Sequence, residues 1–235
     1  MHWRKLIDAS RLYRERVEKA NEAYDLHMKQ RNPDQWERNE GPSEPEIKLL
    51  FTFLNQLGTH YPNNPESRIR FKRVYKEVLS RLRLLEGYDL IEAPFDGEVA
   101  DGETLSGTIQ EVFEALATAN RELTKRYEST GTSKILHVLR PRLFVMWDSA
   151  IRGGYAVKDS SQSSDYAFWF LPRMQREARE AVDSFVADTK SERGVAVQEL
   201  EKRAEENLGE KRFITKLLDE YNWCKFRLGC RELWE

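Results

Sequence analysis

The sequence contains little cysteine and no long hydrophobic run. Its two cysteines, Cys224 and Cys230, are too few for a four-cysteine zinc or iron–sulfur site and do not resemble the disulfide framework of a small secreted protein. No uncharged stretch reaches the roughly 18 residues that a membrane helix needs, and residues 1–8 lack the apolar run of a signal peptide. We therefore expect a cytoplasmic protein with no metal, no cofactor and no membrane partner.

An excess of one charge is also missing. The chain has 38 basic and 40 acidic side chains and a net charge of −2, so no global field recruits nucleic acid or an anionic membrane. Any such binding has to come from a local patch. Aromatic residues are plentiful, with 11 Phe, 9 Tyr and 6 Trp, which is enough to build a sizeable core and argues against intrinsic disorder.

Hydrophobic spacing predicts an all-α protein, a compact multi-helix domain of seven to nine helices. No segment alternates over enough residues for a sheet of three or more strands, and Ser43 with Glu46 fits a capping box for one helix. We expect two lobes around a cleft, an N-terminal lobe at 1–104 and a second lobe at 105–235. The main helices are expected at 3–30, 47–57, 68–85, 105–127, 133–139, 166–189, 195–208 and 211–227.

Two neighbouring segments have opposite charge. Residues 68–83 carry seven basic side chains and one acidic side chain, Glu77. In residues 86–103 all of the charged side chains are acidic. Arg70 and Lys72 on the basic helix are candidates for binding nucleic acid. The alternatives are a solvated helix face, or a face that the acidic loop 86–103 covers and neutralises.

One stretch carries a pattern typical of a reactive site. It runs Gly131-Thr132-Ser133-Lys134-Ile135-Leu136-His137 and continues, after Pro141, with Phe144-Val145-Met146-Trp147-Asp148-Ser149-Ala150-Ile151-Arg152. This stretch resembles the helix-hairpin-helix DNA glycosylase superfamily, particularly its oxoguanine glycosylase branch. In that family two helices meet at a glycine hairpin, a lysine begins the second helix, and an apolar segment leads to an aspartate that caps the next one. Lys134 and Asp148 match these two roles in order, and a single glycine, Gly131, stands in the hairpin.

The resemblance implies cleavage of an N-glycosidic bond in a modified or damaged nucleobase. Lys134 would be the amine nucleophile, Asp148 would stabilise the positive charge that develops on the sugar, and His137 would be a supporting catalytic group one turn from Lys134. The target base would leave the stack and enter an apolar pocket. The nucleic-acid contacts that the resemblance implies, through backbone N–H groups at a helix start and one cation, are Gly131, Thr132, Ser133 and Arg152.

A second interpretation comes from a different class of function. The chain could be a non-catalytic helix-hairpin-helix module that binds nucleic acid or a partner protein. Because relatives of the oxoguanine type also occur in anti-phage operons, such a module could act in a defence complex, with the acidic loop 86–103 as a contact surface. In the enzyme, Lys134 and Asp148 must share an open pocket with an aromatic wall. In the binding module, Asp148 caps its helix and Lys134 points into bulk water.

Overall fold

The computed structural model describes residues 1–100, 102–156 and 161–230, and helices make up most of this part of the chain. The strands described are β1 (Glu98–Ala100) and β2 (Glu103–Thr104), which pair in one antiparallel hairpin. The prediction of a compact all-α domain is therefore confirmed. Within these ranges, no helix is both long enough and apolar enough to cross a membrane.

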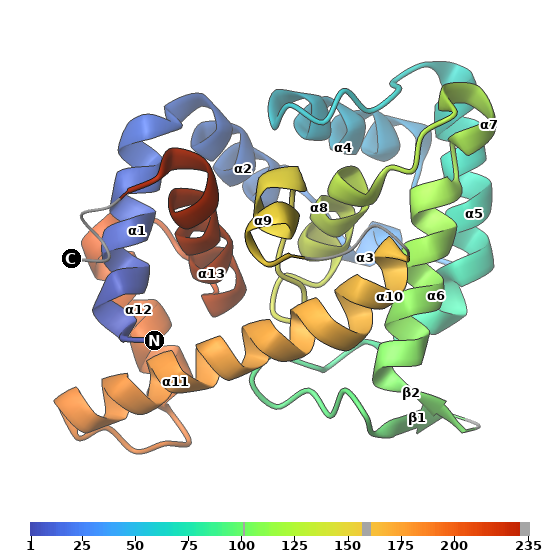
Figure 1. Ribbon diagram of the computed structural model, residues 1–235. Coiled ribbons are helices and arrows are strands. Elements are labelled where there is room, and N and C mark those ends of the chain that lie inside the picture. The colour runs from blue at the N-terminus through green and yellow to red at the C-terminus, as the bar shows by residue number, and fades with distance from the viewer. Residues whose placement is uncertain (101, 157–160, 231–235) are drawn as a thin grey trace.

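Most of the helices follow one another through short connections, whereas a longer segment that contains the hairpin joins α5 to α6 (Figure 1). In chain order they are α1 (Trp3–Arg16), α2 (Glu18–Gln30), α3 (Pro33–Trp36), α4 (Glu44–Gln56), α5 (Pro65–Leu84), α6 (Leu105–Thr118), α7 (Arg121–Thr124), α8 (Ser129–Leu139), α9 (Ser149–Gly154), α10 (Gln162–Ser164), the π-helix η1 (Asp165–Phe170), α11 (Leu171–Thr189), α12 (Ala196–Leu208), α13 (Ile214–Trp223) and the π-helix η2 (Cys224–Leu228). The predicted capping box of Ser43 and Glu46 is present at the start of α4.

The single helix expected at 3–30 is two helices. Val17 interrupts it with φ −134° and ψ 43°, outside the helical region. The break lets the two halves follow different partners, because α1 packs against α11, α12 and α13 whereas α2 packs against α4. The N-terminal helix thus contacts the C-terminal helices closely, and these contacts cross the boundary expected between lobes 1–104 and 105–235 (Figure 1).

The hairpin region also differs from the expectation. The helix expected at 105–127 ends as α6 at Thr118, α7 follows it, and α8 begins at Ser129, so Gly131 lies inside α8 and makes no turn. A Cβ added to Gly131 would come within 2.8 Å of Cδ2 of Tyr61. The buried Tyr61 ring therefore explains this glycine through close packing. The chain turns instead at Lys125, which has a left-handed backbone (φ 58°).

The acidic segment 86–103 packs against α11. Its apolar side chains Leu90, Ile91 and Phe95 are buried, and Nε2 of Gln175 donates hydrogen bonds to three of its backbone carbonyls, the shortest at 2.8 Å. The part of the segment around residues 90–93 is therefore held against a long helix through its backbone.

Candidate functional site

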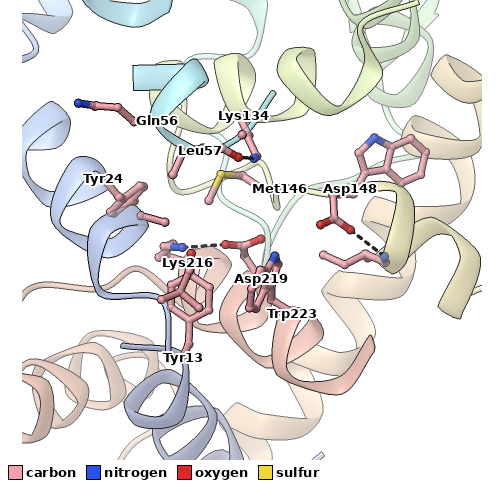
Figure 2. Close-up of a pocket in the computed structure, with 15 residues that line it drawn as sticks. Tyr13, Tyr24, Gln56, Leu57, Lys134, Met146, Asp148, Lys216, Asp219 and Trp223 are labelled. Carbon is pink, nitrogen blue, oxygen red and sulfur yellow. Dashed lines mark hydrogen bonds and ion pairs between the residues drawn. The ribbon is translucent and has the colours of Figure 1, made fainter. Parts of the chain in front are cut away.

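A cavity of about 240 Å³ opens between the N-terminal helices, the end of α4, the start of α9, and helices α8 and α13 (Figure 2). A more polar cleft of about 360 Å³ adjoins it. The two share five lining residues, so they form one continuous site: Leu57, Gly58, Lys134, Asp148 and Trp223. The structure therefore places Lys134 and Asp148 on the same cavity.

Lys134 projects from α8 into this cavity, and its side chain is half-buried. Its Nζ donates a hydrogen bond of 3.1 Å to the backbone carbonyl of Leu57. That carbonyl is free because α4 ends at Gln56, just before Gly58 turns the chain with φ +74°. Burial lowers the pKa of Lys134 to about 8, although the nearby carboxylates of Asp219 and Asp148 act to raise it. A substantial fraction of this amine is neutral near physiological pH.

The two carboxylate oxygens of Asp148 have different partners. Its Oδ1 accepts hydrogen bonds of 2.9 Å from the backbone N–H groups of Ala150 and Ile151, as expected for a helix cap. Its Oδ2 lies 3.5 Å from Nη1 of Arg227. The cap therefore fixes the carboxylate in one orientation while the second oxygen remains at the cavity.

Ser133 sets the relative position of Lys134 and Asp148. Its hydroxyl donates to the backbone carbonyl of Trp147 at 3.0 Å and accepts from the Trp147 N–H at 3.1 Å. Ser133 directly precedes Lys134 in the chain, and Trp147 directly precedes Asp148. This bridge joins α8 directly to the buried segment that ends at Asp148.

The cavity also contains a buried ion pair that the sequence analysis missed. Nζ of Lys216 donates to Oδ2 of Asp219 at 2.7 Å and lies 3.4 Å from Oε1 of Glu220. Both Lys216 and Asp219 line the cavity, and in Figure 2 they face Lys134 from the other side. The sequence did contain a signal for this pair, since Lys216, Asp219 and Glu220 have the i, i+3 and i+4 spacing of side chains that meet on one helix face. Burial raises the pKa of Asp219, and Lys216 opposes this shift.

Aromatic side chains form much of the cavity wall. Tyr13, Tyr24 and Trp223 line it, and the rings of Tyr13 and Trp223 pack edge to face with centroids 5.3 Å apart. These rings give the cavity a partly aromatic wall, against which a flat ring can pack.

The adjoining polar cleft lies at the start of α8. Ser129 and Thr130, the first residues of that helix, line it together with Arg152 and Arg227. Nη1 of Arg152 donates a 3.0 Å hydrogen bond to Oγ of Ser129 and another to Gln162. Two cations and a helix start thus surround a cleft that leads to the cavity, an arrangement that favours an anion.

His137 does not have the catalytic position expected for it. Its ring is fully buried between Tyr24 and Phe144. The Phe144 carbonyl can only accept, so Nδ1–H donates to it at 2.7 Å, and Nε2 of the neutral ring accepts from the Tyr24 hydroxyl at 2.8 Å. Burial lowers the pKa of His137 to about 3. His137 is therefore a structural histidine that orients Tyr24, and it does not line the cavity itself.

The expected phosphate contacts at Gly131, Thr132 and Ser133 need the same correction. All three residues are buried within α8, the Thr132 N–H bonds to the Glu128 carbonyl at 2.8 Å, and the Ser133 hydroxyl binds Trp147. Their polar groups face the protein because helix α8 starts earlier than expected. The residues of this helix that reach the cleft are Ser129, Thr130 and Lys134.

Arg70 and Lys72 lie on α5 and line neither the cavity nor the cleft. The guanidinium of Arg70 pairs with Glu66 at 3.2 Å and also with Glu122, and Lys72 is half-buried. Other arginines of this helix pair in the same way, mostly with carboxylates outside 86–103; the pairs are Arg68–Glu44, Arg73–Glu77, Arg81–Glu111 and Arg81–Glu103. Four of the seven basic side chains thus pair with carboxylates, and among the described residues Glu103 is the partner that comes from the acidic segment.

No three His, Cys, Asp or Glu side chains in the described part of the chain lie close enough together to hold a metal ion. Comparison of the chain with protein-family models, with curated proteins and with solved structures gives no match. The function has to be inferred from the residues of the cavity and the cleft.

Proposed function

We propose that this protein cleaves the N-glycosidic bond of a modified or damaged nucleobase, with Lys134 as the nucleophile and Asp148 as the charge stabiliser. One observation carries the proposal. A partly buried amine whose pKa is lowered to about 8 shares a cavity with a helix-capping aspartate and three aromatic side chains. This combination meets the requirements of amine-based covalent catalysis, which needs a deprotonated lysine beside a charge-stabilising carboxylate.

The size of the cavity suits a base that has left the stack. A cavity of about 150 Å³ accepts a benzene ring, so about 240 Å³ leaves space for a two-ring base. The ring would lie among Tyr13, Tyr24 and Trp223, while the sugar and its phosphates remain in the polar cleft with Arg152 and Arg227. This arrangement matches the need of such enzymes to bury the base and keep the backbone in solvent.

The reaction that we propose uses two groups of the protein. The lone pair of Lys134 Nζ attacks C1′ of the sugar, and the base leaves with the electron pair of the glycosidic bond and then takes up a proton from solvent. Asp148 stabilises the positive charge on the sugar through Oδ2, because Oδ1 is occupied by the helix cap. The nitrogen then loses a proton, and its lone pair forms a double bond to C1′ as the C1′–O4′ bond breaks. The electron pair of that bond goes to O4′, which takes up a proton, and a protonated imine links Lys134 to C1′.

The position of Lys134 favours this proposal over the non-catalytic binding module. The module predicts that Lys134 points into bulk water and that Asp148 only caps its helix. Lys134 is instead half-buried and hydrogen-bonded to Leu57, and Asp148 combines the cap with a position on the cavity. Partial burial removes water from the charged amine and costs free energy. A lysine that only faces solvent does not incur this cost.

Borohydride trapping tests the proposal. The protein is incubated with single-stranded and duplex DNA and RNA that carry modified purines, and borohydride reduces any imine to a stable adduct, which peptide mapping assigns. We expect an adduct on Lys134, and its loss in Lys134→Arg, because guanidinium stays protonated and cannot attack. Lys48→Arg, at an exposed lysine of α4, is the matched control and should trap normally. Absence of a Lys134 adduct with every substrate would reject the lyase reaction.

A further inference from the structure

Two lysines share the cavity in opposite electrostatic surroundings. The amine of Lys134 has a neutral partner, the Leu57 carbonyl, whereas the amine of Lys216 contacts the carboxylates of Asp219 and Glu220. Burial lowers the pKa of both amines. For Lys134 this effect dominates and the pKa falls to about 8. For Lys216 the carboxylates outweigh burial, so its pKa lies well above the ordinary value. When the surroundings of two titratable groups in one site move their pKa values apart, the two groups can take different roles.

The charge of Lys216 is also fixed in place. Its side chain is 2% exposed, and its Nζ lies 4.8 Å from the ring centroids of both Tyr13 and Tyr24. An ammonium between two aromatic faces gains cation–π stabilisation from each. Its hydrogen bond to Asp219 then defines the direction of the amine. Lys216 is therefore poorly placed to act as a nucleophile and well placed to act as a permanent cation.

We propose that Lys216 is a positioning residue whose fixed positive charge neutralises Asp219 and so raises the fraction of Lys134 that is neutral and nucleophilic. This inference rests on the proposed role of Lys134 as nucleophile. Without Lys216, Asp219 would face the Lys134 amine as an uncompensated negative charge, whereas Asp148 would still be paired with Arg227. A nearby negative charge favours the charged form of an amine, so the ammonium of Lys134 would then persist to higher pH.

The other charged and titratable groups around the two lysines do not replace Lys216. Arg212 is engaged with Asp25 at 2.7 Å and Glu220 at 3.3 Å. Arg227 faces Asp148 from η2 at 3.5 Å. Lys216 is thus the cation that contacts Asp219 directly among the described residues. The groups that surround the pair are Tyr13 on α1, Tyr24 and Asp25 on α2, Asp148 before α9, Arg212 before α13, Asp219 and Glu220 on α13, and Arg227 on η2.

Competitive labelling with trace acetic anhydride tests this inference without any substrate. The native protein is labelled between pH 6 and 11, and mass spectrometry follows acetylation of Lys134 relative to the exposed Lys48. The midpoint for Lys134 should lie near pH 8 in the wild type. Lys216→Gln removes the charge but retains a donor for Asp219, and should raise the midpoint by about one to three units. Lys216→Arg retains the charge and should leave the midpoint within a few tenths of a unit.

The double variant Lys216→Gln/Asp219→Asn distinguishes the electrostatic effect of Lys216 on Lys134 from a change in the packing of the cavity. It removes both charges of the pair, so the Lys134 midpoint should return towards the wild-type value. If Lys216→Gln does not fold, this neutral pair and Lys216→Arg still test the inference, because both must titrate like the wild type. A wild-type midpoint in Lys216→Gln, or a raised midpoint that persists in the double variant, would overturn the inference. Labelling that behaves as expected without any borohydride adduct would instead reject the proposed glycosylase reaction alone.

Discussion

The pH dependence of base release is the most direct consequence of the surroundings of Lys134. Lowering its pKa from 10.5 to about 8 raises the neutral fraction at pH 7 from about 3 in 10,000 to about 1 in 10, roughly 300-fold. If the neutral amine attacks, the single-turnover rate should rise about tenfold per pH unit between pH 6 and 7.5. It should then level off above about pH 9, where about nine-tenths or more of the amine is deprotonated.

The assay is single-turnover base release with protein in excess over a labelled oligonucleotide, measured from pH 6 to 10. Lys134→Gln is the control, since it keeps a polar side chain of similar length and removes the titrating amine. Its residual rate should show no rise around pH 8. A wild-type rate that is constant across this range, or that continues to rise towards pH 10.5, would refute the inference that burial activates Lys134.

Three further predictions concern other parts of the site. Asp148→Asn should slow base release by at least about tenfold with a small change in melting temperature, because asparagine also caps helices. Asp148→Leu should lower both the rate of base release and the melting temperature. Full activity in the Asn variant would leave Asp148 with a structural role only. Gly131→Ala should lower stability by about 1–3 kcal/mol, since its Cβ would lie 2.8 Å from the buried Tyr61 ring, and a raised melting temperature in calorimetry would contradict that packing. Arg152→Gln should weaken nucleic-acid binding and reduce the salt slope by about one, while Arg70→Glu should change neither, because Glu66 and Glu122 already pair with Arg70; equal slopes in a salt series would contradict this assignment.

The parts of the fold that local chemistry determines could be predicted from the sequence. The capping box of Ser43 and Glu46 and the cap at Asp148 are present, and Gly58 follows the end of α4. These features depend on a few neighbouring residues. The break at Val17 was missed because it depends on which helices α1 and α2 each contact, and those contacts are far apart in the sequence.

The site was predictable only in part for the same reason. Lys134 and Asp148 lie close in the chain, and their shared position on one cavity follows a recognisable pattern. Lys216 and Asp219 come from the C-terminal helix α13, and nothing local shows that this helix faces α8. The expected catalytic role of His137 came from its spacing, which places it on the same helix face as Lys134. That spacing does not show how deeply a side chain on this face is buried. The burial of His137 becomes visible only when Tyr24 and Phe144 are placed around it.

The Ser133 hydroxyl links the two chain segments that carry Lys134 and Asp148. Only 14 positions separate Lys134 from Asp148, and Ser133 and Trp147 have the same spacing one residue earlier. The paired hydrogen bonds between Ser133 and Trp147 hold the two chain segments together directly before the reactive residues. Gly131 then lets Tyr61 pack closely against the same helix. The buried stretch from Gly131 to Ser133 thus holds Lys134 and Asp148 in place, and under the proposed function an anion would contact Thr130 and Arg152, which line the polar cleft.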